Sequence, residues 1–207
     1  MRMASEREAS VDRVISFSDG VMAIAITLLI LPLTEIQRGE GASLINVVAD
    51  NFAALLAFAL SFAVIANYWT IHHAIFRPVR RHDARLVGLN MVWLAAIVFL
   101  PFPTALIADG LDGGFATFYI GSLLIISVLN LFIANYLDNH PELTDAQATE
   151  EGRQHRIASA FVIGTLLLAM IISLFWPTAG IWCLLLLFPA QIIAARVSRR
   201  AAPARLE

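Results

Sequence analysis

The chain has 207 residues, of which 59% are hydrophobic and only 14% are charged. Soluble domains carry about 45–50% apolar and about 25% charged residues, so this composition excludes an ordinary soluble domain. The net charge of −2 is small, and the basic residues form no aromatic-interleaved stripe of the kind found in nucleic-acid-binding proteins. The single cysteine, Cys183, excludes an intrachain disulfide and a cysteine metal site.

The charged residues are clustered, and they leave apolar stretches near the length of about 20 residues that crosses a bilayer. The pattern therefore predicts an all-α, polytopic membrane protein with one six-helix domain over residues 1–207. No cleavage site follows the first apolar stretch, which we interpret as a retained helix rather than a signal peptide. The predicted spans are residues 14–33, 50–75, 86–107, 115–136, 156–176 and 178–196.

Prolines and charged loops separate these spans. Pro32 ends the first span, and Pro78 with the neighbouring arginines ends the second. Pro101 and Pro103 either kink the third span or end it. The acidic segment 138–152 separates the fourth span from the fifth, and we expect a short, solvated surface helix there; attraction of cations to a pore mouth is the alternative.

Arginine placement predicts the orientation of the chain. If residue 1 is cytoplasmic, the cytoplasmic segments hold thirteen arginines and the opposite side holds only Arg38. This asymmetry follows the positive-inside rule and agrees with an even number of spans. We therefore expect both termini to lie in the cytoplasm.

Three of the predicted spans place polar side chains at one depth. These residues are Ser18 and Asp19 in the first span, His72 in the second and Asn90 in the third. Each lies five or six residues inside the nearest boundary arginine, or about 7–9 Å at the helical rise. Ionisable groups in membrane helices usually face other helices. We interpret the layer as a polar clamp that fixes the first helix against the other two.

Two other interpretations of this layer are weighed against the clamp. A proton relay through Asp19 and His72 is the first. A metal site is the second, and it is disfavoured because His72 and His73 are adjacent and point about 100° apart. No HxxxH pair accompanies them.

Beyond Asp19, the first span carries an apolar stripe. Ile24, Leu28 and Leu31 follow i, i+4, i+7 spacing, with Thr27 beside them. Such a stripe ordinarily packs against the bundle or lipid. It would line a pore if a symmetric oligomer brought this helix to a shared axis, since channels can be constricted by apolar rings.

The segment RVISFSDGVMA, residues 13–23, resembles the R-x-x-x-F-S-D-x-x-x-A signature of the transmembrane protein 175 family of potassium channels. The W-x-x-H of residues 69–72, Asn90, and the FLP of residues 99–101 resemble family features of the second and third helices. The resemblance is strongest over residues 13–103, whereas the last three spans match only in number and hydropathy.

This resemblance implies a six-helix repeat without a carbonyl filter, in which the first helix lines the pore. Bacterial members with one repeat form tetramers, so a homotetramer in a bacterial plasma membrane is implied. By position, the narrowest ring would be Ile24, with further rings at Leu28 and Leu31 and a selectivity-related threonine at Thr27. The residues that would hold the pore helix are Arg13, Phe17, Ser18, Asp19, Trp69, His72 and Asn90.

We therefore expect a homotetrameric, potassium-permeable channel with modest K⁺ over Na⁺ selectivity, and not an enzyme. The expected partners are other copies of the chain, the lipid bilayer and permeant K⁺, without a cofactor, resident metal or nucleic acid. The alternative function is a proton-coupled secondary transporter that uses Asp19 and His72. A membrane-embedded enzyme lacks a nucleophile motif or phosphate loop here, and a purely structural subunit would carry no flux.

Overall fold

The computed structural model describes residues 2–36, 41, 43–109, 113–145 and 148–176. This part of the chain is helical apart from turns, loops and one isolated bridge between Val79 and Thr144. The helices are α1 (Arg2–Leu28), α2 (Leu31–Thr34), α3 (Leu44–Asp50), α4 (Phe52–Phe76), α5 (Ala84–Phe99), α6 (Pro101–Asp109), α7 (Gly113–Asp138), the 3₁₀ helix η1 (Pro141–Leu143) and α8 (Ala148–Phe175).

Four helical stretches in the described residues are long and apolar enough to cross a membrane, and they confirm the first four predicted spans. These stretches are Ser10–Thr34, Phe52–Phe76, Ala84–Asp109 and Gly114–Asp138. The fifth predicted span lies in α8, where the apolar stretch with described side chains is Ser159–Phe175. The sixth, residues 178–196, lies outside the described residues.

The predicted separate surface helix within residues 138–152 is wrong. Among the described residues of this segment, η1 is the only separate helix, and α8 already begins at Ala148. One helix therefore runs from the end of the acidic segment into the apolar part, because no residue between them breaks the helical hydrogen bonding.

Proline and aspartate set several helix ends. Pro32 lacks an amide hydrogen and its ring clashes with the carbonyl four residues earlier, so α1 stops at Leu28 before the short α2. Asp83 caps α5, because its Oδ1 accepts a hydrogen bond from the Leu86 N–H at 2.8 Å. Pro101 starts α6 directly after α5, so it interrupts the third span without ending it.

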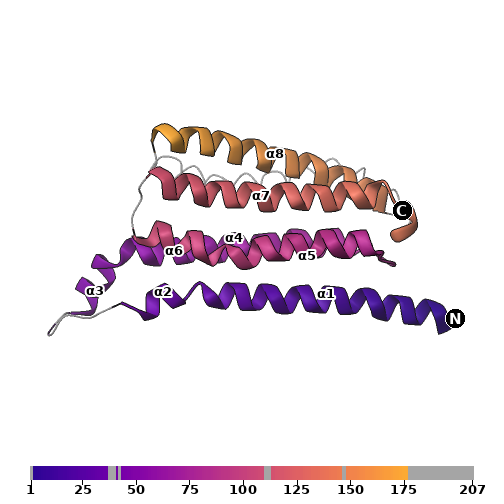
Figure 1. Cartoon of the computed structure of the whole chain (residues 1–207), viewed down its shortest axis with the longest axis horizontal. Helices are drawn as coiled ribbons and strands as arrows, with labels where there is room; N and C mark the ends of the chain where they lie inside the picture. The colour runs from indigo at the N-terminus through magenta and orange to yellow at the C-terminus, as the bar shows by residue number, and fades with distance from the viewer. Residues whose placement is uncertain (1, 37–40, 42, 110–112, 146–147, 177–207) are drawn as a thin grey trace, which may run out of the picture.

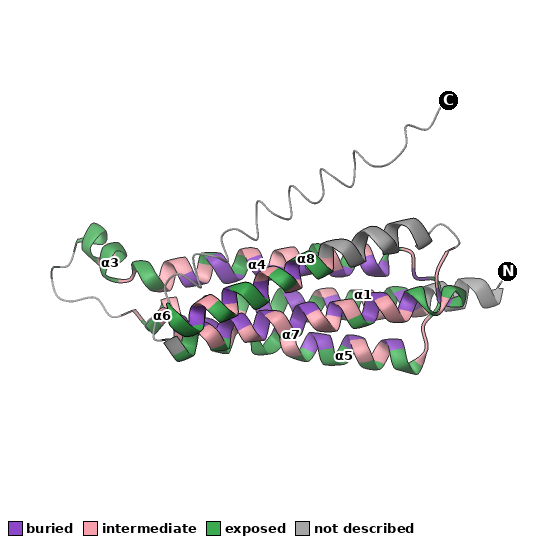
Figure 2. Cartoon of the chain, turned by 90° about the horizontal axis from the view of Figure 1, so that it is seen from above, coloured by how far each residue is buried: buried purple, intermediate pink, exposed green. Residues whose placement is uncertain are grey.

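The helices form layers, with α1 at one edge, α4, α5 and α6 in the middle, and α7 and α8 at the other edge (Figure 1). α1 packs against α4, α5 and α6, whereas α8 packs against α7. Each long helix has a buried face and an exposed face (Figure 2). Exposed residues such as Phe62, Val92 and Phe132 are apolar, as expected of helices bounded by lipid.

One end of the bundle, which we call the arginine-rich end, holds residues 77–85 and the segment 139–145 that packs on them. The Arg80 N–H donates to Leu143 O at 2.8 Å, and the Arg80 guanidinium lies 2.7 Å from the Asp145 carboxylate. The α4–α5 loop and the α7–α8 connection are therefore tied by both backbone and side-chain contacts.

Acidification is expected to loosen this connection. The Arg80 guanidinium lowers the pKa of Asp145, and the Tyr136 hydroxyl that donates to Asp83 lowers the pKa of Asp83. A carboxylate whose pKa is lower in the folded than in the unfolded protein stabilises the fold at pH values above its unfolded pKa of about 3.9. This stabilisation is lost as the pH falls through the pKa of the folded state. Amide hydrogen exchange at Arg80, corrected for intrinsic rates, should be slow at pH 6 and faster once the pH falls below the lowered pKa values of these carboxylates.

An Asp145→Asn variant is the control for this pH effect. It lacks the titrating carboxylate opposite Arg80, so its Arg80 amide should already exchange faster at pH 6 and should change less on acidification. Equal protection of the wild-type amide at pH 6 and at a pH low enough to protonate Asp83 and Asp145 would contradict the role of these carboxylates.

Candidate functional site

Three side chains of the predicted polar layer form a buried hydrogen-bonded chain between α1, α4 and α5. His72 Nε2 lies 2.8 Å from Asn90 Oδ1, and Asn90 Nδ2 donates to Ser18 Oγ at 2.9 Å. Ser18, His72 and Asn90 are each at most 1% exposed. Because each helix contributes one residue, the chain of bonds fixes α1 against the pair α4 and α5.

The direction of these bonds is set at the Ser18 end. Ser18 donates its only hydroxyl hydrogen to Val14 O at 2.9 Å, so it must accept from the Asn90 amide. Asn90 then presents Oδ1 to His72, whose Nε2–H is the donor. The chain ends on a backbone carbonyl, which cannot pass a proton onward, and this geometry favours a structural role over a relay.

Aromatic rings hold the His72 imidazole in place. Phe76 and Trp93 each stack on it with ring centroids 4.4 Å apart, and two rings at that distance must occupy opposite faces. The imidazole plane is therefore fixed, and its Nε2 is held toward Asn90. This arrangement preorganises the buried bond.

Asp19 lies beside this chain of bonds and not within it. Its Oδ1 accepts from Trp69 Nε1–H at 2.8 Å, and the Trp69 indole, which is 42% exposed, stacks on His73 at 5.6 Å. No hydrogen bond joins Asp19 to His72 within the described part of the chain. The predicted clamp of Ser18, Asp19, His72 and Asn90 is thus corrected. Asp19 is rotated about 100° from Ser18 around the helix and bonds to Trp69 instead.

The side of α1 opposite the buried bonds is exposed. Phe17 and Ile24 are 53% and 61% exposed, and Gly20 and Thr27 are exposed as well; Leu31, the first residue of α2, is 53% exposed. The four α1 positions repeat with alternating steps of three and four residues, as one helical stripe does, and Leu31 keeps this spacing beyond the turn that ends α1. The buried residues Ser18, Met22, Ala25 and Leu29 repeat in the same way on the opposite side.

Leu28 departs from the predicted stripe. It is half-buried, whereas Thr27 is exposed with Ile24, and the Thr27 hydroxyl donates to Ile24 O at 2.8 Å. The exposed face therefore contains Ile24, Thr27 and Leu31, with Leu28 at its margin. The prediction grouped Leu28 with this face because i, i+4 spacing places it only about 40° from Ile24 around the helix. The exposed stripe instead extends to the other side of Ile24, where Thr27 lies about 60° away.

Arg13 and Phe17 also lie on exposed positions of α1. No described side chain forms a hydrogen bond or ion pair with Arg13. The anchoring role of these two residues stays a prediction.

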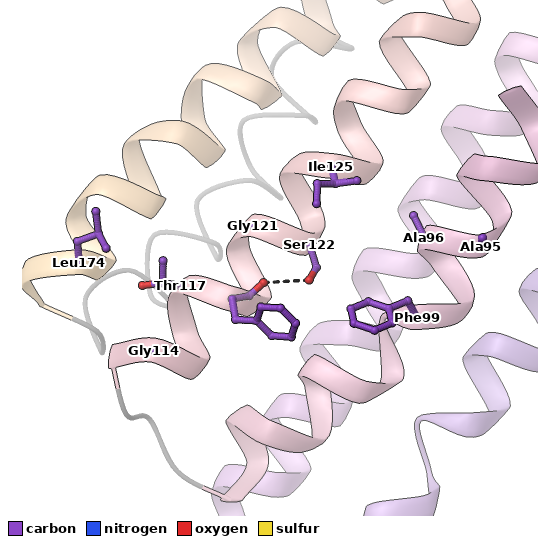
Figure 3. A pocket seen from close by; sticks show the side chains of 10 residues that line it. Ala95, Ala96, Phe99, Gly114, Thr117, Gly121, Ser122, Ile125 and Leu174 are labelled. Carbon is purple, nitrogen blue, oxygen red and sulfur yellow. Dashed lines mark hydrogen bonds between the residues drawn. The ribbon is translucent and has the colours of Figure 1, made fainter.

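A separate pocket of about 970 Å³ lies between α5 and α7, with Leu174 of α8 at its margin (Figure 3). Small residues such as Ala95 and Gly121 form much of its wall, together with Phe99 and Ile125. Its lining residues carry no charge and none belongs to α1, so the pocket is not part of the candidate site. Within the described residues, no three His, Cys, Asp or Glu side chains gather to hold a metal ion.

Comparison with known proteins points to a channel family. A family model described as "Endosomal/lysosomal potassium channel TMEM175" matches residues 13–101. A protein of Chamaesiphon minutus named as a potassium channel is 31% identical over 194 residues, which cover 87% of this chain and 94% of the relative. This chain belongs to the TMEM175 family.

Two further comparisons place the chain within the TMEM175 family. The crystal structure of a lysosomal potassium-selective channel TMEM175 homolog from Chamaesiphon minutus superposes with a TM-score of 0.76 at 28% identity, covering 90% of this chain and 98% of that one. The human relative, named an endosomal/lysosomal proton channel, is 27% identical over 137 residues, which are 65% of this chain and 27% of the human protein.

Sequence reasoning missed a second group of buried polar residues in this TMEM175-family fold. Ser61 of α4 lies 3.0 Å from the Tyr119 hydroxyl of α7 and accepts from Thr104 Oγ1 at 2.8 Å. Two turns along, the Tyr68 hydroxyl of α4 lies 2.8 Å from Ser127 Oγ of α7. These bonds join helices that are distant in sequence, and only isolated polar residues in apolar spans hint at them.

Proposed function

We propose that this chain forms a potassium-permeable channel as a homotetramer, with four copies of α1 around a central axis. The observation that carries this proposal is the two-sided character of α1. One side of α1 is bonded into its own bundle through Ser18, whereas the opposite side exposes Phe17 and Ile24 at the edge of the fold, and Leu31 is exposed at the start of α2. A helix at the edge with an unpartnered stripe is suited to meet its symmetry copies.

Ile24 is the proposed constriction, with Thr27 and Leu31 further along the same face and Leu28 at its margin. A ring of isoleucine side chains excludes most of the water around a permeating cation. Potassium gives up its hydration more readily than sodium, so such a ring favours K⁺. The selectivity is modest, because the ring offers few oxygen ligands.

The wider arrangement belongs to the same proposal. Residues 1–207 form a single six-helix domain, embedded in a bacterial plasma membrane with both termini in the cytoplasm. The arginines of residues 77–85 lie at the predicted cytoplasmic end of the bundle, in keeping with the positive-inside rule. The potassium-channel names of the bacterial relatives support the proposed permeant ion.

Proton transport is the competing function, since the animal relatives are named proton channels. The geometry gives little support to a relay through Asp19 and His72. The His72 bonds lead to a backbone carbonyl, and Asp19 is engaged by Trp69 instead. A pathway for protons along the exposed face of α1 is compatible with the same oligomer.

Flux measurements on the purified protein in liposomes test the proposal. We expect a K⁺ gradient alone to drive flux, and single-channel recordings to show unitary currents whose reversal potential follows K⁺. Saturable flux that requires a pH gradient would instead support a proton-coupled secondary transporter that uses Asp19 and His72. Absence of flux from correctly inserted tetramers would favour a structural subunit.

A further inference from the structure

Two buried polar atoms in the described part of the protein have no hydrogen-bond partner. They are the indole Nε1 of Trp93 on α5 and the amide Oδ1 of Asn130 on α7. Trp93 is 0% exposed and Asn130 is 3% exposed. Buried polar groups in proteins are almost always bonded to protein or to ordered water, so this pair calls for an explanation.

The contacts between α4 and α7 place Asn130 at the level of His72. These helices run in the same direction, because Ser61 bonds to Tyr119 and Tyr68 bonds to Ser127. His72 lies about 6 Å beyond Tyr68, and Asn130 lies about 4.5 Å beyond Ser127. Since the His72 ring stacks on the Trp93 ring at 4.4 Å, Asn130 and the Trp93 indole lie at nearly the same depth.

The side of α7 that carries Asn130 also faces these rings. Asn130 follows Tyr119 by eleven residues, which is a rotation of about 1,100°, or about 20° from three full turns. Tyr119 faces α4, because its hydroxyl bonds to Ser61. Asn130 therefore points toward α4, where His72 and Trp93 are stacked.

The directions of the two side chains bring them closer together. Helical side chains tilt toward the N-terminus of their own helix. α5 and α7 run in opposite directions, since Asp83 at the start of α5 contacts Tyr136 near the end of α7. Trp93 and Asn130 consequently lean toward each other along the bundle axis.

We propose that one ordered water molecule is bound inside each protomer between Trp93 and Asn130. The water accepts a hydrogen bond from Trp93 Nε1–H and donates one to Asn130 Oδ1, so one donor and one acceptor are satisfied together. A buried water with two to four polar partners is a common solution for such atoms. The inference does not depend on the proposed channel function.

This water extends the polar layer to α7. The layer already joins α1, α4 and α5 through Ser18, His72 and Asn90. The water holds the Trp93 ring against His72 and ties it to α7 through Asn130. The site is structural, because neither an indole nor a carboxamide side chain ionises in the physiological pH range.

Nuclear magnetic resonance of the full-length protein in lipid nanodiscs, with ¹⁵N-labelled tryptophan, tests the site directly. Comparison with a Trp93→Phe variant assigns the Trp93 indole signal among the four tryptophans. We expect a cross-peak between the Trp93 Nε1 proton and water. Its absence in the wild-type protein would overturn the proposal whether or not any variant folds.

An Asn130→Leu variant tests the second bond of the water. We expect it to lose the cross-peak and to unfold several degrees lower than the wild type, because the water and the Trp93 N–H lose a partner. Ser122→Ala, in which the lost bond is to Phe118 O of the same helix, is the matched control and should keep the cross-peak. A higher unfolding temperature for Asn130→Leu would indicate a dry, unsatisfied amide and would overturn the proposal.

Discussion

Replacement of Ile24 by asparagine is expected to lower the K⁺ to Na⁺ permeability ratio about tenfold, which corresponds to ~1.4 kcal/mol between the two transport barriers. In the proposed tetramer, four Ile24 side chains form an apolar ring that both ions must pass with little of their hydration. Asparagine supplies amide oxygens that replace lost water ligands, and this benefits the more strongly hydrated Na⁺ most. The ratio is measured from reversal potentials under opposed K⁺ and Na⁺ gradients in planar bilayers.

Ile125→Asn is the matched control for this substitution. Ile24 and Ile125 are 61% and 58% exposed, but Ile125 lies on α7 at the far side of the fold from α1. Its replacement introduces the same amide at an equally exposed position, at the wall of the α5–α7 pocket, without altering the proposed pore. If Ile24→Asn conducts robustly with wild-type selectivity, the constriction lies elsewhere on α1 or on another helix.

The depth of the polar layer could be predicted from sequence because it depends on two quantities that sequence contains. Boundary arginines mark the membrane surface, and every helical residue advances by the same rise. Ser18, His72 and Asn90 were placed at one level by this count, and the structure joins them by hydrogen bonds. The first four spans were predictable for the same reason, since length and hydropathy are local properties.

Rotation about the helix axis was harder to predict than depth. Asp19 shares the depth of Ser18 but points to another side, where Trp69 and not His72 is within reach. Leu28 was likewise assigned to the exposed stripe although it is half-buried. The direction of a face depends on the neighbours against which the helix packs, and these neighbours come from distant parts of the chain.

Register between non-consecutive helices was not predictable at all. The axial offsets between α4, α5 and α7 determine that Ser61 meets Tyr119 and that Trp93 lies level with Asn130. Apolar side chains of many kinds fill a helix interface, so no local pattern of one sequence fixes this offset. The interruption at Pro101 was foreseen only as one of two outcomes, because the same proline can kink a helix or end it.

The structure separates the residues that hold α1 from the residues proposed to meet the ion. Ser18 lies on the buried side of the helix, and Ile24 lies on the exposed side. Substitutions on the two sides should therefore act on different observables. Loss of a buried bond should weaken the fold or the assembly, whereas a change on the exposed stripe should alter permeation.

Asn90→Leu is expected to destabilise the protein by about 2–3 kcal/mol, because it removes the central member of the buried chain. Leucine is similar in size but leaves the His72 Nε2–H without its acceptor and Ser18 Oγ without the Asn90 donor. Thermal unfolding of the detergent-solubilised protein and the yield of tetramer by size-exclusion chromatography measure the loss. Tetramers that do assemble should keep the wild-type permeability ratio.

Asp19→Ala provides the graded comparison for this prediction. It removes the hydrogen bond from Trp69, whose side chain is 42% exposed, so we expect a smaller loss of stability and of tetramer yield, about 1 kcal/mol. Both variants should affect assembly more than ion preference. If Asn90→Leu were as stable as the wild type, the polar layer would not be what holds α1. If Asp19→Ala assembled normally but lost K⁺ preference, the division between the two faces of α1 would be wrong.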